Sequence, residues 1–202
     1  MSNGISYPVF RTPDRALALR VARQMVAFGV QSFSDVSVEA QVPTLTDARR
    51  IRDALPEAGF TSWTAPVDPG PGVLDLFGGV PARELPDDLA RVEEFLPFTV
   101  HLQEQPVGSI EDHFASAVSP HPARIHWDGL VWPAAPERDL YGEGTHAEVT
   151  LLLNCGSIEL DVRADTHSVL VHVRRRSDGD DERFAGWLAE QIGQRVIGPP
   201  HG

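Results

Sequence analysis

The sequence predicts an α+β protein, with an N-terminal β-α-β-α unit followed by a C-terminal antiparallel β-meander and a packed C-terminal helix. Two observations lead to this prediction. In the N-terminal part, segments with apolar residues at helical spacing follow segments of strand-like character. In the C-terminal half, three segments alternate apolar and polar residues and are joined by very short connections, which is typical of antiparallel strands.

The N-terminal unit begins with a short apolar stretch at residues 5–10. We expect a helix over residues 14–28, with Thr12 as its N-cap and Pro13 in its first turn, because both residue types favour those positions. Gly29 directly follows this segment, at the place where glycine commonly ends a helix.

The second half of this unit repeats the pattern. Residues 34–42 alternate valine or alanine with polar residues, which predicts a half-buried strand. A second helix is predicted over residues 47–55, capped by Thr44 or Thr46, and a further strand at residues 60–65.

A break in the pattern follows, because residues 65–73 hold three prolines and two glycines. The sequence therefore predicts an N-terminal subdomain (1–65), a linker or loop (66–85) and a C-terminal α+β subdomain (86–202), with one continuous domain as the alternative. The last of these segments opens with a helix predicted over residues 86–96, with acidic residues in its first turn.

Two more elements are expected before the meander. Residues 109–118 predict a short helix with Ser109 as N-cap. Residues 125–132 predict a hairpin, since Asp128 and Gly129 together favour a type I′ turn.

The predicted meander consists of strands at residues 146–154, 157–164 and 168–174, with two-residue turns between them. The register of these turns brings apolar residues opposite apolar residues, which supports it. The facing pairs are Leu151–Leu160, Val149–Val162, Leu160–Val171 and Val162–Val169.

The last predicted helix, at residues 180–196, needs an apolar partner. We expect it to dock on the aliphatic face formed by Val149, Leu160 and Val171. Its inward residues are Phe184, Trp187 or Leu188, Ile192 and Val196.

The opposite, polar face of the predicted meander pairs charged residues across strands. Such pairs contribute about 0.2–1 kcal/mol each, so a stabilising role is enough to explain them. The same side chains would also form the wall of a small-molecule or catalytic site, if the protein has one. They are Glu148, Glu159, Asp161, Arg163 and His172, paired as Glu148–Arg163 and Glu159–His172, with Asp161 facing Thr150.

The charge balance excludes several kinds of chemistry. The chain has 29 acidic and 17 basic residues, a net charge of -12, and all its basic residues are arginine. Without lysine there is neither a Schiff base to a carbonyl group nor a P-loop. The negative charge disfavours nucleic acid and favours encounter with a basic protein, although solubility alone would also explain it.

Residues 111–128 contain three histidines, which raises the question of a metal site. The candidate ligands are His113, His121, His126 and Asp128. They fall on three different predicted elements, and the histidines lack the one-turn spacing of a compact metal motif, so we expect neither a metal nor another cofactor.

Other catalytic patterns are weak. The chain has no G-x-S-x-G motif, and its only cysteine, Cys155, falls at a predicted turn, where an incidental thiol is favoured over a nucleophile paired with His146 or His172. Residues 142–147 match G-x-G-x-x-A but precede a strand, which a dinucleotide site does not.

These observations favour an acidic, cytoplasmic, non-catalytic protein-binding module, such as an inhibitor or immunity-type protein. Its basic partner would bind Glu148, Glu159 and Asp161, and there is neither a secretory signal nor a membrane-spanning run. The alternative is a small-molecule enzyme or ligand-binding protein with its site on the polar sheet face, which a closed pocket of ~300–1,000 Å³ there would favour. The oligomeric state stays open.

Overall fold

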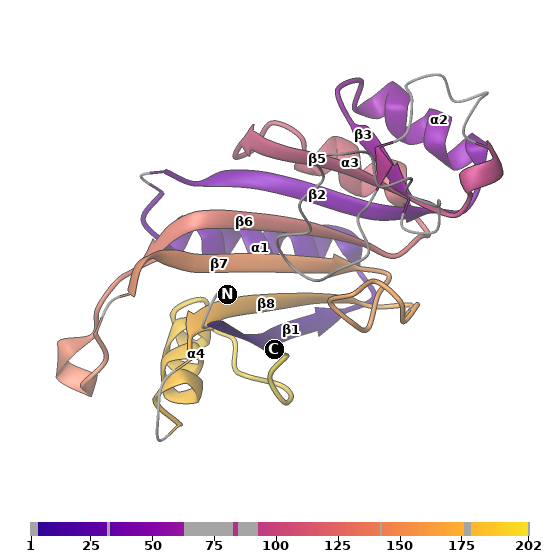
Figure 1. The fold of residues 1–202 in the computed structure, drawn as a ribbon. Helices are drawn as coiled ribbons and strands as arrows, with labels where there is room; N and C mark the ends of the chain where they lie inside the picture. The colour runs from indigo at the N-terminus through magenta and orange to yellow at the C-terminus, as the bar shows by residue number, and fades with distance from the viewer. Residues whose placement is uncertain are drawn as a thin grey trace, which may run out of the picture.

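A computed structural model describes residues 4–31, 33–62, 83–84, 93–141, 143–175 and 179–201. Its centre is an eight-stranded sheet in the order β1-β8-β7-β6-β2-β5-β3-β4, with every neighbouring pair antiparallel (Figure 1). The strands are β1 (Gly4–Thr12), β2 (Asp35–Val42), β3 (Gly59–Ser62), β4 (Arg83–Glu84), β5 (Phe98–Pro106), β6 (Ala123–Trp132), β7 (Glu143–Leu153) and β8 (His167–Arg174).

The α-helices are α1 (Arg15–Phe28), α2 (Leu45–Ala54), α3 (Glu111–Val118) and α4 (Asp180–Gln191), with short 3-10 turns at Glu93–Phe95 and Pro136–Arg138. The α+β class, the N-terminal β-α-β-α unit and the packed C-terminal helix are confirmed, and so is a C-terminal antiparallel meander, which consists of β6, β7 and β8. None of the helices in the described part of the chain is long and apolar enough to cross a membrane.

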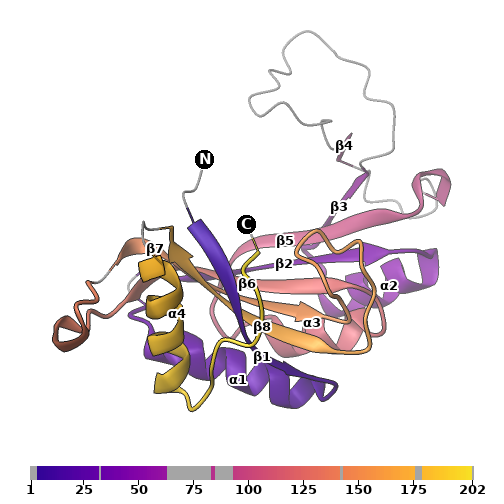
Figure 2. The ribbon, with the colours of Figure 1, turned by 90° about the horizontal axis from the view of Figure 1, so that it is seen from below.

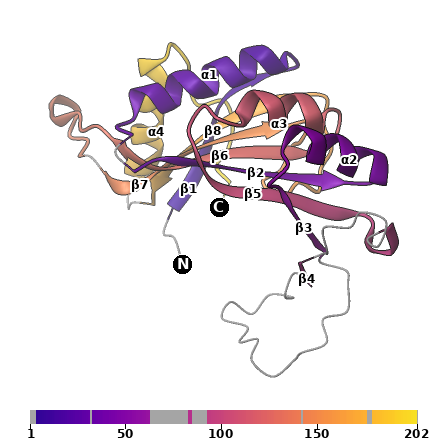
Figure 3. The same cartoon turned by 90° about the horizontal axis from the view of Figure 1, so that it is seen from above.

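Helices α1, α2 and α3 cover one face of the sheet (Figure 3), so the main core lies between that face and the helices. Helix α4 packs on β8 and β1 and contacts α1 through the rings of Trp187 and Phe28, whose centroids are 5.7 Å apart. The chain after α4 returns along β1, where Ser6 and His201 exchange backbone hydrogen bonds of 2.9 and 2.8 Å (Figure 2).

Strands from both predicted halves lie in this one sheet, since β2 sits between β5 and β6. The predicted linker, residues 66–85, lies outside the described residues except for β4, and most of the predicted helix at 86–96 lies outside them too. The described end of that segment is the 3-10 turn Glu93–Phe95.

An N-cap residue was predicted for three of the helices, and the observed cap differs from the prediction in two of them. Helix α1 is capped by Asp14, whose side chain accepts a hydrogen bond from the backbone N–H of Leu17, so Thr12 and Pro13 precede the cap. Helix α2 is capped by Thr44, as one of the two alternatives predicted.

Helix α3 has Ile110 rather than Ser109 at its N-cap, without a side-chain cap. The reason lies in Glu111, whose carboxylate accepts hydrogen bonds from the backbone N–H groups of Gly108 and Ile110 and so satisfies the donors around the helix start. Glu111 also accepts a 3.0 Å hydrogen bond from the indole of Trp127 and is buried, which makes it a structural residue.

The predicted hairpin at residues 125–132 is wrong: β6 runs straight through, with a bulge between Trp127 and Leu130. Gly129 has the positive φ (66°) expected of a turn, but it serves the bulge. The backbone carbonyl oxygen of Phe33 lies so close that a Cβ on Gly129 would be 2.5 Å from it.

The register predicted for the meander is also wrong. Strand β7 pairs directly with β8, with Val149 opposite Val171 and Leu151 opposite Val169, and residues 154–166 connect the two strands instead of forming a third. The predicted cross-strand pairs of charged residues therefore do not form, and Glu148 faces His172.

The connection 154–166 folds onto the otherwise polar face of the sheet. Leu160, at φ 60°, is buried there in a small second core with three residues: Leu152, Cys155 and Leu170. Two of these, Leu152 and Leu170, are apolar side chains on the otherwise polar face of β7 and β8. The alternating segment 157–164 leaves the sheet because it buries these two side chains.

Helix α4 docks on the expected part of the sheet, because Phe184 and Leu188 share the main core with Val149 and Val171. Leu160 was expected in that docking surface and lies in the second core instead. Trp187 and Leu188 are both buried, whereas Ile192 and Val196 are only partly buried against the core.

Candidate binding site on the open sheet face

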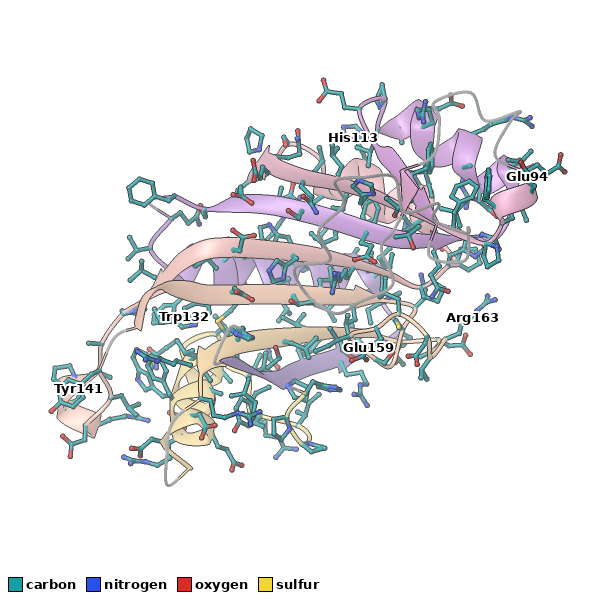
Figure 4. The ribbon with its side chains drawn as sticks, viewed as in Figure 1. Glu94, His113, Trp132, Tyr141, Glu159 and Arg163 are labelled. Carbon is teal, nitrogen blue, oxygen red and sulfur yellow. The ribbon has the colours of Figure 1, made fainter. Side chains whose placement is uncertain are left out.

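The face of the sheet opposite the helices, which we term the open face, carries the polar half of each alternating strand (Figure 4 looks onto it). Successive side chains of a strand point to opposite faces, so the residues between the buried ones gather here. From the central strands they are Asp35, Ser37 and Glu39 of β2, Arg124, His126 and Asp128 of β6, and Glu148 and Thr150 of β7.

A pocket of about 390 Å³ lies on the open face over β2, β5 and β6. Its volume falls at the lower end of the range of small-molecule binding sites. Its lining residues are Asp35, Ser37, Val38, Glu39, His101, Gln103, Glu104, Arg124, His126 and Asp128.

Two carboxylates face each other in this pocket, because Asp35 and Asp128 are direct partners in the β2–β6 register. Burial and the nearby charges of Asp35, Glu148 and Glu104 raise the pKa of Asp128 to about 6. Burial and Glu104 raise the pKa of Asp35 as well. The Oδ1 atom of Asp35 is buried and accepts no hydrogen bond from the described residues, so this acceptor is unsatisfied.

Arg124 is the only basic side chain among the lining residues, apart from histidines. Its Nη2 atom lies 2.5 Å from an oxygen of Glu39, the residue opposite it on β2. The charges of Arg124 and Glu39 cancel each other. The carboxylates of Asp35, Glu104 and Asp128 therefore give the pocket a net negative charge.

A histidine network borders the pocket. The Nδ1 atom of His126 lies 2.9 Å from the hydroxyl of Thr150, and its Nε2 atom lies 3.5 Å from Glu148. Burial, with the charge of Arg124 and the neighbouring His172, lowers the pKa of His126 to about 4. The ring is therefore neutral at pH 7 and adds no positive charge to the pocket.

Ser6, His172 and Glu148 form a second hydroxyl–histidine–carboxylate group beside this network. A Ser-His-Glu catalytic relay requires the hydroxyl and the carboxylate to bind different ring nitrogens. Here the Ser6 hydroxyl (3.0 Å) and Glu148 (3.9 Å) both approach Nδ1 of His172. The Nε2 atom lies so close to Gly4 that a Cβ there would be 1.7 Å away, and Ser6 is buried. Ser6 is therefore not an activated nucleophile. Thr150, whose hydroxyl and Glu148 lie at different nitrogens of His126, meets this condition but is itself buried.

Among the residues predicted for a catalytic wall, Glu148 and His172 come together on the open face. Glu159, Asp161 and Arg163 are exposed on the connection 154–166, where Figure 4 labels Glu159 and Arg163. None of the three lines the pocket. The wall therefore does not form as predicted, because its middle strand does not exist.

The candidate metal ligands are divided between the two faces of the molecule. His113 is exposed on α3 (Figure 4), whereas His126 and Asp128 line the pocket. The Nε2 atom of His121 lies 3.1 Å from a carboxylate oxygen of Asp47. Burial opposes ionisation of Asp47, but hydrogen bonds from Thr44 and His121 lower its pKa overall.

Within the described ranges, no group of three or more His, Cys, Asp or Glu side chains is placed to hold a metal ion. Cys155, the other chemically reactive candidate, is fully buried in the second core, where it serves packing.

Sequence reasoning did not single out seven of the nine polar lining residues: Asp35, Ser37, Glu39, His101, Gln103, Glu104 and Arg124. The alternation of residues 34–42 was the available signal, since it places the first three on one face.

Comparisons with protein-family models, with curated proteins and with solved structures found no match for this chain.

Proposed function

We propose that this chain is an acidic, cytoplasmic binding protein that recognises a basic protein partner with the open face of its sheet, in the manner of an inhibitor or immunity-type protein. One observation carries the proposal: the pocket on this face holds Asp35, Glu104 and Asp128, and its only arginine is already paired with Glu39. An unbalanced negative pocket on a chain of net charge -12 complements a cationic surface.

The position of these carboxylates also supports binding. Asp35 and Asp128 stand on β2 and β6, each of which is paired with a neighbour on both sides. Side chains on such strands are held in place before the partner arrives, so less conformational entropy is lost on binding.

A capture experiment with two double variants tests the proposal. Asp35→Asn/Asp128→Asn removes two charges from the pocket. Glu159 and Asp161, which the sequence assigned to the partner, lie on the connection 154–166 outside the pocket, so Glu159→Gln/Asp161→Asn removes two charges there as a matched control. We expect the wild type and the control, immobilised in lysate of the source cells, to retain the same basic protein, identified by mass spectrometry, and the pocket variant to lose it. Equal retention by all three, or no retained basic protein, would contradict the proposal.

A small-molecule enzyme or ligand-binding protein is the second candidate, and one observation favours it. Asp128, with a pKa of about 6, and His126, with a pKa of about 4, line the same pocket, and pKa values shifted in this way are common in active sites. Native mass spectrometry of the purified chain tests this candidate. A bound small molecule that Asp128→Asn releases would support it over the protein partner.

A further inference from the structure

We infer that the pocket receives a single guanidinium group, the side chain of an arginine, between Asp35 and Asp128. The inference rests on the proposed function and specifies the chemistry of the partner at its point of contact. Three features of the described residues support it: the placement of the two carboxylates, the unsatisfied oxygen of Asp35, and the surroundings of the pair.

The placement of the two carboxylates suits a planar cation. Asp35 and Asp128 are directly opposite each other on antiparallel strands and on the same face, where Cα atoms are about 4.5–5.5 Å apart. A guanidinium group presents five N–H donors in a rigid plane and can bind both carboxylates at once. An ammonium group is a compact, strongly hydrated charge and bridges such a pair less well, so we expect arginine to be preferred to lysine.

The unsatisfied oxygen is an observation independent of the charge. The Oδ1 atom of Asp35 is buried and accepts no hydrogen bond from the described residues, although a buried acceptor without a donor costs about 1–3 kcal/mol. Because this atom is not accessible to solvent in the free protein, a donor supplied by a ligand would satisfy it once the Asp35 side chain rotates toward the pocket.

The surroundings of the pair fit an arginine side chain and not only its head group. The pocket of about 390 Å³ leaves room for the aliphatic stem, and the neutral ring of His126 does not repel a cation. Phe33, two residues before Asp35, is 80% exposed, and its backbone lies against Gly129, the neighbour of Asp128. An exposed aromatic side chain at this end of β2 offers a contact to the residues that flank the arginine in the partner.

Binding of the guanidinium group should depend on pH, because it competes with protonation of Asp128. The raised pKa of Asp128 means that its carboxyl is partly protonated near pH 6, and a guanidinium group binds the ionised form. Guanidinium itself stays protonated throughout, so binding should strengthen as the pH rises from about 5 to about 7.

The test is an NMR titration of the full chain with N-acetyl-arginine amide, recorded on backbone amides. Two probes serve as controls: N-acetyl-lysine amide, and N-acetyl-citrulline amide, which has nearly the same shape without the charge. We expect saturable shifts at Asp35 and Asp128 with the arginine probe, binding weaker by about fivefold or more with the lysine probe, and no saturable binding with citrulline. The arginine affinity should fall about tenfold or more in Asp35→Asn and in Asp128→Asn but not in Asp53→Asn, an exposed position on α2.

Three results would overturn the inference: equal binding of arginine and citrulline, retained affinity in both pocket variants, or shifts spread evenly over surface carboxylates that include Asp53. Thermal unfolding of each variant verifies that it is folded. If the arginine probe fails while capture of the basic protein still depends on Asp35 and Asp128, the proposed function stands and the single-guanidinium inference falls.

Discussion

At the scale of single residues, Asp128 makes the free protein less stable than it could be. Its folded pKa of about 6 lies above the unfolded value near 3.9, so the folded state binds the proton more tightly. The stability gained from this proton is fully present below about pH 4 and is lost as the pH rises through about 6.

Asp128→Asn should therefore be more stable than the wild type at pH 7 by about 1–2 kcal/mol, after allowance for solvent screening, and equally stable near pH 4. Urea denaturation at several pH values between these limits measures the difference. Asp53→Asn, an exposed change of the same chemistry, should show no such trend. If the difference in stability between Asp128→Asn and the wild type does not change with pH, burial and the neighbouring carboxylates do not raise the pKa of Asp128.

Gly129 is the second residue with a sharp expectation, because it combines a φ of 66° with the close approach of the Phe33 carbonyl. Gly129→Ala should cost about 1–3 kcal/mol more than Gly108→Ala, which has φ 90° but open space around its Cβ position. Chemical denaturation of the two variants measures both losses of stability. Gly108→Ala reports the cost of a positive φ alone, and Gly129→Ala reports that cost together with the steric contact. Equal losses would mean that the segment before β2 moves freely away from β6.

At the scale of elements, the sequence was a good guide where the periodicity was long and local. The alternation of residues 34–42 and the helical spacing of 14–28 correspond to β2 and α1 with small differences at the ends. The alternation of residues 157–164 misled, because apolar residues that cover Leu152 and Leu170 from outside have the same spacing as a strand. Periodicity records burial and does not say against which surface a residue is buried.

The connection 154–166 gives a test that separates the observed arrangement from the predicted register, in which residues 157–164 form a strand between those at 146–154 and 168–174. Leu160 is buried in the second core, whereas Val162 is 52% exposed. Leu160→Ala should cost about 2–4 kcal/mol and Val162→Ala less than about 1 kcal/mol, measured by urea denaturation. In the predicted register both residues would be core positions. Similar large losses of stability in the two variants would therefore support that register over the observed one.

Helix α4 should contribute strongly to stability through Leu188, which is fully buried in the main core. Leu188→Ala should cost about 2–5 kcal/mol in the free energy of unfolding. Glu182→Ala, an exposed change on the same helix, should cost less than about 1 kcal/mol. A loss below about 1 kcal/mol for Leu188→Ala would show that α4 is peripheral to the fold.

At the scale of the whole molecule, the candidate site could not be derived from the sequence, because it depends on strand order. Asp35 meets Asp128 only because β2 lies beside β6, and no local pattern specifies that long-range pairing. His126 and Asp128 were singled out by residue type, and Glu148 and His172 by the alternation of their strands. The structure places all four on the open face together. Their partners on β2 and β5 were missed for the same reason of topology.

The central claim is that a negative pocket on the open face binds a cationic group of a basic protein, and its most direct test is the rate of association with the captured partner. Exposed charges are screened over about 8 Å at ~0.15 M salt, so the wild-type rate constant should fall about tenfold or more between low and physiological salt. Asp35→Asn/Asp128→Asn should slow association at low salt and flatten this dependence, whereas Glu159→Gln/Asp161→Asn should leave both nearly unchanged. A wild-type rate constant that is independent of salt, or equal effects of the two double variants, would contradict the claim.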